Sequence, residues 1–262
     1  MAVDLKTFAA IFFDLDGTLS NEDHPLPGAT ELVGRLLAAG RKIACLSNST
    51  QSPGRVVRRL QGVGIGLPAD LVHTAAAAAV EYVLNCFGPN PRVFNLATEG
   101  VQEELDGKAI WAEGEHDPCD AVIIANPACH YCTPTRMQIG MRLIRGGAEC
   151  VGICADRAYP SPSGLEIGSG ATTKMFAYAA DVEPVFFGKP QERFFLGLCE
   201  RLKVKPADCV LIGDSLDSDI AGAKQAGMKT ILTLTGVTRR SDLDRALPEQ
   251  RPDWVVNDLT EL

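Results

Sequence analysis

The chain has 262 residues, 46% of them hydrophobic and only 6% aromatic, so aliphatic side chains must supply most of a sizeable core. Its 33 acidic and 25 basic residues give a net charge of −8, which excludes the basic footprint that binds nucleic acid polymers or anionic membranes. The apolar run near the N-terminus spans only a few residues, too few for an export signal or a membrane span, so we expect a soluble, cytoplasmic protein.

Short apolar strands alternate with helices along the chain, which predicts an α/β fold with a mainly parallel, Rossmann-like sheet. The first part predicts strands at 8–13 and 42–46 and helices at 27–39 and 53–62. The middle part predicts helices at 74–86 and 134–145 and strands at 92–95, 121–125 and 149–153. The last part predicts helices at 191–202 and 218–226 and strands at 184–187, 209–212, 230–234 and 254–256. We therefore expect a core formed by 1–76 and 183–262, with a smaller α/β domain inserted over 77–182.

Nine cysteines in a chain of this length do not indicate a disulfide scaffold. Cys129-His-Tyr-Cys132, followed by Cys150 and Cys154, raises the alternative of a zinc site. However, Cys150 and Cys154 lie in a predicted strand, where residues four apart are separated by roughly 13 Å. We favour the absence of a structural metal here, and the sequence leaves open whether either cysteine pair has a metal or redox role.

The segment Asp14-Leu15-Asp16-Gly17-Thr18 directly follows the first predicted strand. Residues two apart at a strand end point to the same side, so Asp14 and Asp16 are expected to project together into the ligand crevice of a parallel sheet. Two carboxylates placed there repel each other unless a cation lies between them. The alternative is an ordinary acidic turn, because Asp and Gly are common turn residues.

Two further segments that follow predicted strands suit a phosphate group. Ser47-Asn48-Ser49-Thr50 offers hydroxyl, amide and backbone N–H groups, although a helix cap before Pro53 is the alternative. Lys189 follows the predicted strand 184–187 and can neutralise a phosphoryl group, although a lone lysine is more often solvated.

A fourth segment, Asp214-Ser215-Leu216-Asp217-Ser218-Asp219, follows the predicted strand 209–212. Negative charge is favourable at a helix N-terminus, which explains one or two of its carboxylates but not Asp214, directly at the strand end. All four segments lie at the carboxyl ends of predicted parallel strands, so we expect them to converge on one site.

In order, residue type and spacing, these four segments resemble the four motifs of the haloacid dehalogenase superfamily of hydrolases. The insertion between the second and third motifs resembles a C2-type cap. Ser-Asn-Ser, Gly-Lys-Pro and Gly-Asp-Ser-Leu-x-Ser-Asp-Ile resemble subfamily IIA, which includes NagD-like nucleotide phosphatases, 4-nitrophenylphosphatases and pyridoxal phosphate phosphatases. The resemblance covers nearly the whole chain. It implies a Mg²⁺-dependent phosphatase acting on small phosphate monoesters of nucleotide, sugar or pyridoxal phosphate type.

The resemblance also implies roles for the core residues. Asp14 would be the nucleophile that forms an aspartyl-phosphate, and Asp16 the general acid and base. Mg²⁺ would be bound by the Asp14 carboxylate, the Asp16 backbone carbonyl and Asp214, with Asp219 and Ser215 behind these ligands.

The phosphoryl oxygens would be held by a set of polar side chains, namely Ser47, Asn48, Ser49 and Lys189. The segment 126–134 occupies the place of the family's substrate-specificity loop but departs from its usual Asp- and Tyr-containing pattern, which leaves the substrate open. Asp156-Arg157-Ala158-Tyr159-Pro160 resembles the family's Asn-Pro-Asp stretch. The candidate substrate contacts in the cap are His130, Tyr131 and Tyr159.

Two other functions remain alternatives. A phosphotransferase such as a phosphomutase uses the same aspartyl-phosphate, and a non-catalytic binding module can be built on the same fold. A dehalogenase is disfavoured, because a second carboxylate and an acidic fourth motif suit a metal-bound phosphate better. The expected partner is a small phosphorylated metabolite, not a nucleic acid polymer or a membrane, and a homodimer through the cap is the candidate assembly.

Overall fold

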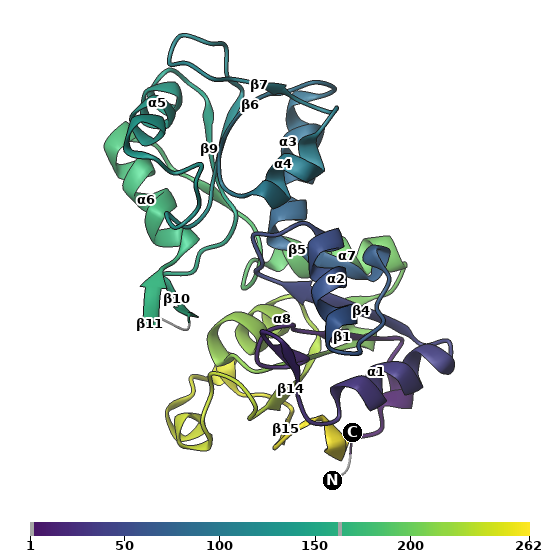
Figure 1. The fold of residues 1–262 in the computed structure, drawn as a ribbon. Helices are drawn as coiled ribbons and strands as arrows, with labels where there is room; N and C mark the ends of the chain where they lie inside the picture. The colour runs from purple at the N-terminus through teal and green to yellow at the C-terminus, as the bar shows by residue number, and fades with distance from the viewer. Residues whose placement is uncertain (1–2, 162–163) are drawn as a thin grey trace. The chain divides into compact units, whose positions relative to one another are not determined.

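Strand β1 (Ala10–Phe13) lies inside a six-stranded sheet, because all four of its side chains are apolar and buried. The computed structural model describes residues 3–161 and 164–262. In it the sheet has the order β15-β14-β13-β1-β4-β5 (Figure 1). The other strands are β4 (Lys42–Ser47), β5 (Val72–Thr74), β13 (Cys209–Gly213), β14 (Lys229–Thr233) and β15 (Trp254–Val256). β1 pairs in parallel with both β13 and β4, so their carboxyl ends meet at one edge.

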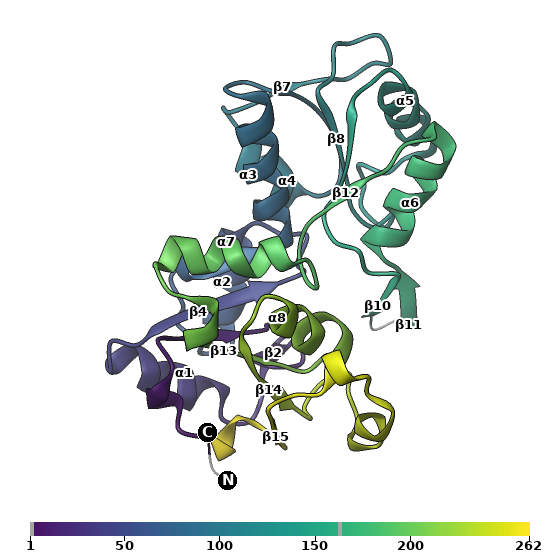
Figure 2. The ribbon, with the colours of Figure 1, turned by 180° about the vertical axis from the view of Figure 1, so that it is seen from behind.

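Helices cover both faces of this sheet (Figures 1 and 2). They are α1 (Ala29–Ala38), α2 (Pro53–Gly62), α7 (Glu192–Leu202) and α8 (Ala221–Gln225). The apolar stripes of α1 and α2 pack on alternate strand residues such as Ile11 and Phe13 in one buried cluster. α8 packs on β14, and α7 packs on α8. A short hairpin of β2 (Ser20–Asn21) and β3 (His24–Pro25) follows β1.

A second, five-stranded sheet has the order β12-β9-β8-β6-β7, and every pairing in it is parallel. Its strands are β6 (Arg92–Leu96), β7 (Ile110–Trp111), β8 (Ala121–Ile124), β9 (Glu149–Gly152) and β12 (Val185–Phe186). α3 (Ala75–Phe87) and α4 (Glu99–Leu105) cover one face, and α5 (Pro134–Arg145) and α6 (Ser169–Ala180) cover the other (Figure 1). An antiparallel ribbon joins β10 (Ala158–Ser161) to β11 (Gly164–Ile167).

The α/β fold class with a parallel-sheet core is confirmed, but one strand assignment is wrong. The predicted strand 184–187 was expected beside the core strands, whereas β12 pairs with β9 in the five-stranded sheet. A run this short carries no signal for its partner, because the sheet it joins is decided by tertiary packing.

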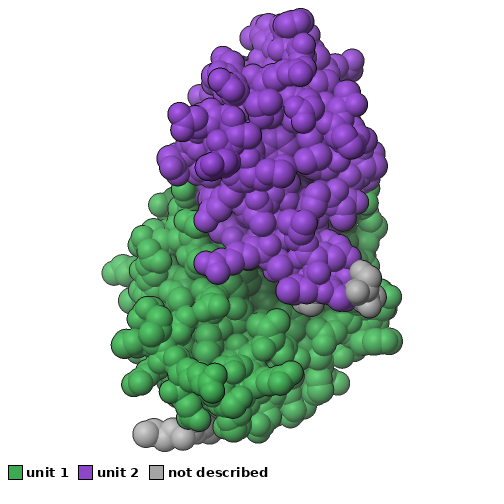
Figure 3. Space-filling model, turned by 90° about the vertical axis from the view of Figure 1, so that its left-hand side faces the viewer, with its two compact units in different colours: residues 1–47, 53–73, 189–262 green, residues 48–52, 74–188 purple. Residues whose placement is uncertain are grey.

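The chain divides into two compact units, coloured separately in Figure 3. Unit 1 comprises residues 1–47, 53–73 and 189–262, and unit 2 comprises residues 48–52 and 74–188. The core-and-cap organisation with a cap over 77–182 stays a prediction. Within 3–161 and 164–262, no helix has the length and apolar character needed to cross a membrane.

Candidate active site

Three adjacent strands of unit 1 end in polar side chains. Asp14 directly follows β1, Asp214 directly follows β13, and Ser47 is the last residue of β4. The Asp14 backbone N–H donates to the Ile212 carbonyl at 2.8 Å, which extends the ladder between β1 and β13 up to the site. All three side chains are buried, so the strand ends form a desolvated polar group.

Lys189 lies in the same group and is only 3% exposed. Its ammonium Nζ donates to Oδ1 of Asp219 at 2.6 Å and also to Oδ1 of Asp14. The sequence suggested that a strand of the core sheet positions Lys189. The preceding strand β12 belongs to the other sheet, so the ion pairs with Asp14 and Asp219 hold Lys189 in this group.

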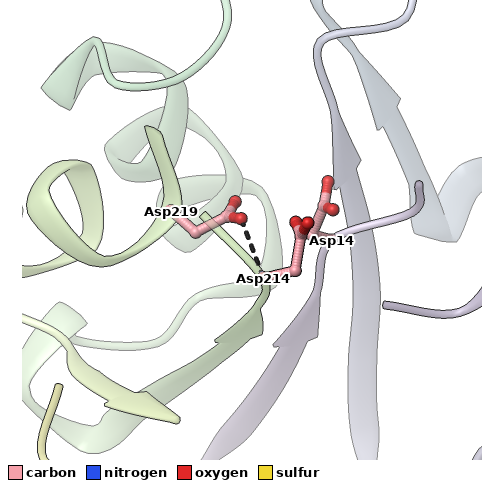
Figure 4. A group of neighbouring side chains, drawn as sticks. All are labelled: Asp14, Asp214 and Asp219. Atoms are coloured by element: carbon pink, nitrogen blue, oxygen red, sulfur yellow. Dashed lines mark hydrogen bonds between the residues drawn. The ribbon is translucent and has the colours of Figure 1, made fainter. Parts of the chain in front are cut away.

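Asp219 lies on a π-helical turn over Leu216–Ile220 and is fully buried. Its Oδ2 accepts the backbone N–H of Asp214 at 3.1 Å (Figure 4). The same oxygen accepts the backbone N–H of Ser215 at 3.0 Å. The Ser215 hydroxyl accepts the backbone N–H of Ser218 at 3.2 Å and so caps the turn. Asp219 therefore ties this turn to the lysine, and π-helical turns of this kind are frequent at functional sites.

Asp14, Asp214 and Asp219 form the one group of at least three His, Cys, Asp or Glu side chains, within 3–161 and 164–262, whose ligand atoms lie within 4.8 Å of one another (Figure 4). Burial raises the pKa of Asp14 well above 3.8, against the opposing effect of Lys189. Burial and then the Asp219 charge raise the pKa of Asp214 to about 6. Burial by itself lowers the pKa of Lys189, but Asp14 and Asp219 outweigh it and raise that pKa. Three carboxylates and one ammonium leave a net charge of −2 when all are ionised, which suits a divalent cation.

Gly17 brings the backbone close to this group. Its φ of +87° lies in the left-handed region, and a Cβ atom there would lie 2.5 Å from Oδ2 of Asp214. The glycine of the first motif is therefore required both by backbone conformation and by space.

The Asp16 carboxylate is not one of these three clustered carboxylates. Its side chain is 56% exposed, and its Oδ1 accepts a hydrogen bond from Arg59 at 2.7 Å. Phe13 and Leu15 are both buried in the apolar cluster of unit 1. Arg59, on α2, is thus a partner of Asp16.

The second motif divides between the units after Ser47, since Asn48 and Ser49 belong to unit 2. The Asn48 amide nitrogen donates to Oδ1 and Oδ2 of Asp156 at 3.2 and 3.1 Å. The Ser49 hydroxyl accepts the backbone N–H of Gln51 at 3.2 Å, as in a turn before a helix. Asp156 belongs to the segment that resembles the family's Asn-Pro-Asp stretch. No local sequence pattern predicts its contact with Asn48, which lies 108 residues away.

The three candidate cap contacts lie in unit 2. Nδ1 of His130 lies 2.9 Å from Oε1 of Glu99, and the His130 ring packs on Tyr131 with centroids 4.1 Å apart. The Tyr159 hydroxyl donates to Oε2 of Glu166 at 2.6 Å across the β10–β11 ribbon. Tyr159 therefore belongs to the ribbon, whereas the other two residues belong to the loop before α5.

The chain matches known proteins over almost its whole length. Residues 11–110 match the family described as haloacid dehalogenase-like hydrolase, and residues 186–262 match the family described as HAD-hydrolase-like. Haloacid dehalogenase-like hydrolase domain-containing protein 2 of Bos taurus is 31% identical over 93% of this chain and 90% of its own. The 5'-nucleotidase YutF of Bacillus subtilis is 27% identical over 98% of both chains.

Solved structures give the same relationship. The glycerol phosphate phosphatase of Mycobacterium tuberculosis in complex with magnesium has a TM-score of 0.88 and 26% identity, over 100% of this chain and 79% of that one. The 4-nitrophenylphosphatase of Thermotoga maritima has a TM-score of 0.87 and 28% identity, over 98% of this chain and 97% of that one. The M. tuberculosis enzyme has also been solved with calcium, so that relative binds divalent metal ions. The chain therefore belongs to the haloacid dehalogenase-like hydrolases, in subfamily IIA.

Proposed function

We propose that the protein is a phosphatase that hydrolyses small phosphate monoesters through an aspartyl-phosphate on Asp14. The observation that carries the proposal is the contact of the buried Asp14 carboxylate with Lys189, beside Asp214 and Asp219. A buried carboxylate next to a fixed ammonium can attack phosphorus while the ammonium balances the charge of the transferred oxygens. The named activities of the relatives, which include a nucleotidase and a glycerol phosphate phosphatase, support this reaction class.

In the proposed reaction Asp14 attacks phosphorus in line with the ester oxygen, and the ester bond breaks as the acyl phosphate forms. Asp16 donates a proton to the leaving oxygen and later accepts one from the attacking water. Its carboxylate is exposed, and Arg59 holds it in place. Lys189 and Ser47 bind the phosphoryl oxygens, and Asn48 and Ser49 would join them at the beginning of unit 2.

The chemistry of the donors fits Mg²⁺, a hard cation that prefers oxygen ligands. Asp14, Asp214 and the Asp16 backbone carbonyl would hold the ion, with Asp219 and Ser215 supporting them. When bound, the ion neutralises negative charge on the phosphoryl group and on the carboxylates. Chelation should therefore abolish turnover, added Mg²⁺ should restore it, and Ca²⁺ should restore little, because its looser coordination tolerates bidentate binding of the nucleophile. Full turnover in metal-free buffer would refute the proposal.

We propose that unit 2 is the cap, with His130, Tyr131 and Tyr159 as its substrate contacts. A small phosphorylated metabolite in the cytoplasm is the expected substrate. A homodimer through the cap is the proposed assembly, and the large exposed apolar side chains of β11 and α6 in unit 2 support it, namely Leu165, Ile167, Met175 and Tyr178. Light scattering of the native chain and of Leu165→Asp would test it, since the dimer should dissociate in the variant.

The nucleophile is tested by trapping labelled phosphoenzyme from an activated aryl phosphate. Asp14→Asn should form none and should lose turnover. Asp16→Asn should turn over poorly yet accumulate label, because a good leaving group needs little protonation. If the Asp14→Asn variant had an unchanged circular dichroism spectrum and still formed labelled phosphoenzyme, the assignment of Asp14 as the nucleophile would be contradicted.

The cap contacts are tested by a screen of nucleotides, sugar phosphates and pyridoxal phosphate. Replacing His130 and Tyr131 by Ala should change the order of preference among these metabolites more than the rate with a small aryl phosphate, because remote contacts supply orientation and discrimination. His116→Ala is a matched control, since this unit 2 histidine is 94% exposed and lies outside the loop. A preference order identical in the double variant and the control would remove the loop from recognition.

A further inference from the structure

The segment Cys129-His130-Tyr131-Cys132 lies between the end of β8 and the start of α5. β8 and β9 pair in parallel on either side of α5, so the two cysteines open the helix of a β–α–β unit. A C-x-x-C pair at this place is typical of dithiol redox sites. Neither cysteine takes part in the phosphatase reaction proposed above.

The backbone brings the two cysteines within disulfide range. The Cys132 N–H donates to the Cys129 carbonyl at 3.1 Å, which closes a four-residue turn. Such a turn places its end Cα atoms less than about 7 Å apart, and a disulfide spans Cα atoms roughly 4.4–6.8 Å apart. Both sulfur atoms face the same acceptor, the Leu96 carbonyl, at 4.0 Å for Cys129 and 3.8 Å for Cys132. Because both thiols lie against one carbonyl oxygen, little movement is needed to join them.

The two thiols differ as an attacking and a resolving cysteine do. Cys129 is partly exposed, whereas Cys132 is 8% exposed in the apolar cluster under α5. The Cys132 side chain stabilises the Cys129 thiolate by hydrogen bonding and lowers the pKa of Cys129 to about 7. The same hydrogen bond and burial raise the pKa of Cys132. A thiolate at neutral pH on the accessible residue is the arrangement that thiol–disulfide exchange requires.

We propose that Cys129 and Cys132 form a dithiol that low-molecular-weight disulfides such as oxidised glutathione convert reversibly into an intramolecular disulfide. The Cys129 thiolate attacks one sulfur of the small disulfide, whose S–S bond breaks and releases one thiolate. The Cys132 thiol then loses its proton to solvent and attacks the Cys129 sulfur, which releases the second thiolate. Two protein thiols are oxidised and one small disulfide is reduced to two thiols.

Zinc is the competing ligand for such a pair. A structural zinc site takes four protein ligands. Among residues 3–161 and 164–262, the only clustered group of three or more His, Cys, Asp or Glu side chains is the aspartate site of unit 1. The intervening His130 lies with its Nδ1 2.9 Å from Glu99. The arrangement therefore favours exchange chemistry over metal binding.

The test incubates the reduced, native chain with oxidised glutathione, blocks free thiols and digests the product. Trypsin yields the peptide 109–136, which also contains Cys119, and chymotrypsin then cuts it after Tyr131. In a Cys119→Ser background the two fragments stay together only if Cys129 is bonded to Cys132, so the expected result is a joined pair that a reductant separates, with the loss of both free thiols of this peptide. In Cys132→Ser, glutathione should remain on Cys129 as a stable mixed disulfide, and in Cys129→Ser position 132 should stay free.

Cys86 is the matched control, because it is exposed at the end of α3, away from the C-x-x-C turn. Cys86→Ser should form the 129–132 disulfide as the native chain does, whereas Cys86 itself should gain only glutathione. Metal analysis of the protein as purified completes the test. Glutathione on Cys86 without a bond between the chymotryptic fragments would overturn the proposal, and so would one equivalent of zinc that Cys129→Ser loses.

Discussion

Asp219→Asn should destabilise unit 1 far more than the same change at Asp253. Both aspartates accept hydrogen bonds from a lysine ammonium and from backbone N–H. Asp253 accepts them from Lys229 at 2.8 Å and from the Thr230 N–H at 3.0 Å. They differ in burial, since the Asp219 and Lys189 side chains are 1% and 3% exposed, whereas those of Asp253 and Lys229 are 22% and 53% exposed. The pair of substitutions therefore isolates the effect of desolvation on one chemical change.

The magnitude follows from the partners of Asp219. An asparagine there has one acceptor oxygen, so its NH₂ group must face either the Lys189 ammonium or the backbone N–H groups of Asp214 and Ser215. Breaking one side of a buried ion pair costs about 4 kcal/mol. Removing one of three repelling carboxylates returns about 1 kcal/mol, less than the roughly 1.4 kcal/mol of one pKa unit. We expect a loss of about 3 kcal/mol for Asp219→Asn, and of less than about 1 kcal/mol for Asp253→Asn, where solvent screens the pair.

The chain offers a probe specific to unit 1. It has two tryptophans, Trp111 in unit 2 and Trp254 in unit 1, so Trp111→Phe leaves Trp254 as the only one. Urea unfolding followed by Trp254 fluorescence, with chelator present, gives the stability of unit 1 in each variant. Equal losses in the two asparagine variants would refute the reasoning, because burial would then not decide the strength of these contacts.

Further perturbations test the site from other directions. Gly213→Ala should lower kcat/KM about 100-fold, because the added Cβ would lie 2.4 Å from Cγ of Asp219 and must displace that side chain. Gly197→Ala is the control: no atom lies within 4 Å of its added Cβ, so it should stabilise α7 by up to about 1 kcal/mol. Equal kcat/KM in the two variants would contradict this. Arg59→Met should slow alkyl phosphates more than aryl phosphates with good leaving groups, since it frees Asp16, the proposed proton donor. Kinetics over a leaving-group series measures this, and a uniform slowing would instead mean that Arg59 serves binding. Dialysis against chelator should lower the thermal midpoint of unit 1. Added Mg²⁺ should raise it again, because ion binding stabilises the folded unit by RT ln(1 + [Mg²⁺]/Kd).

Asp14 and Asp214 of the carboxylate group were predictable because they follow strands with unambiguous signals. The runs before Asp14 and Asp214 are uninterrupted apolar segments, which indicate strands buried on both faces of a parallel sheet. All strands of a parallel sheet end at the same edge, so predicting these two strands was enough to place both aspartates at that edge.

What failed depended on contacts between distant residues. The two-residue strand β12 takes its partner from tertiary packing, and the short strands β5 and β7 were not predicted for the same reason. The pairing of Asp16 with Arg59 spans 43 residues. No periodicity within either segment encodes such a contact.

The position of Lys189 in the site also depends on contacts between distant residues. Only Phe187 and Gly188 separate it from β12, whose register is set by β9 in unit 2, while its ammonium belongs to the aspartate group of unit 1. The strand before it cannot fix its position in unit 1 as β1 fixes that of Asp14. Its two carboxylate partners must do so, and Asp219 is the one that the proposed reaction leaves chemically unchanged. Asp219 therefore holds the lysine in place both before and after Asp14 carries the phosphoryl group, which is the physical basis for a loss of activity that accompanies the loss of stability in Asp219→Asn.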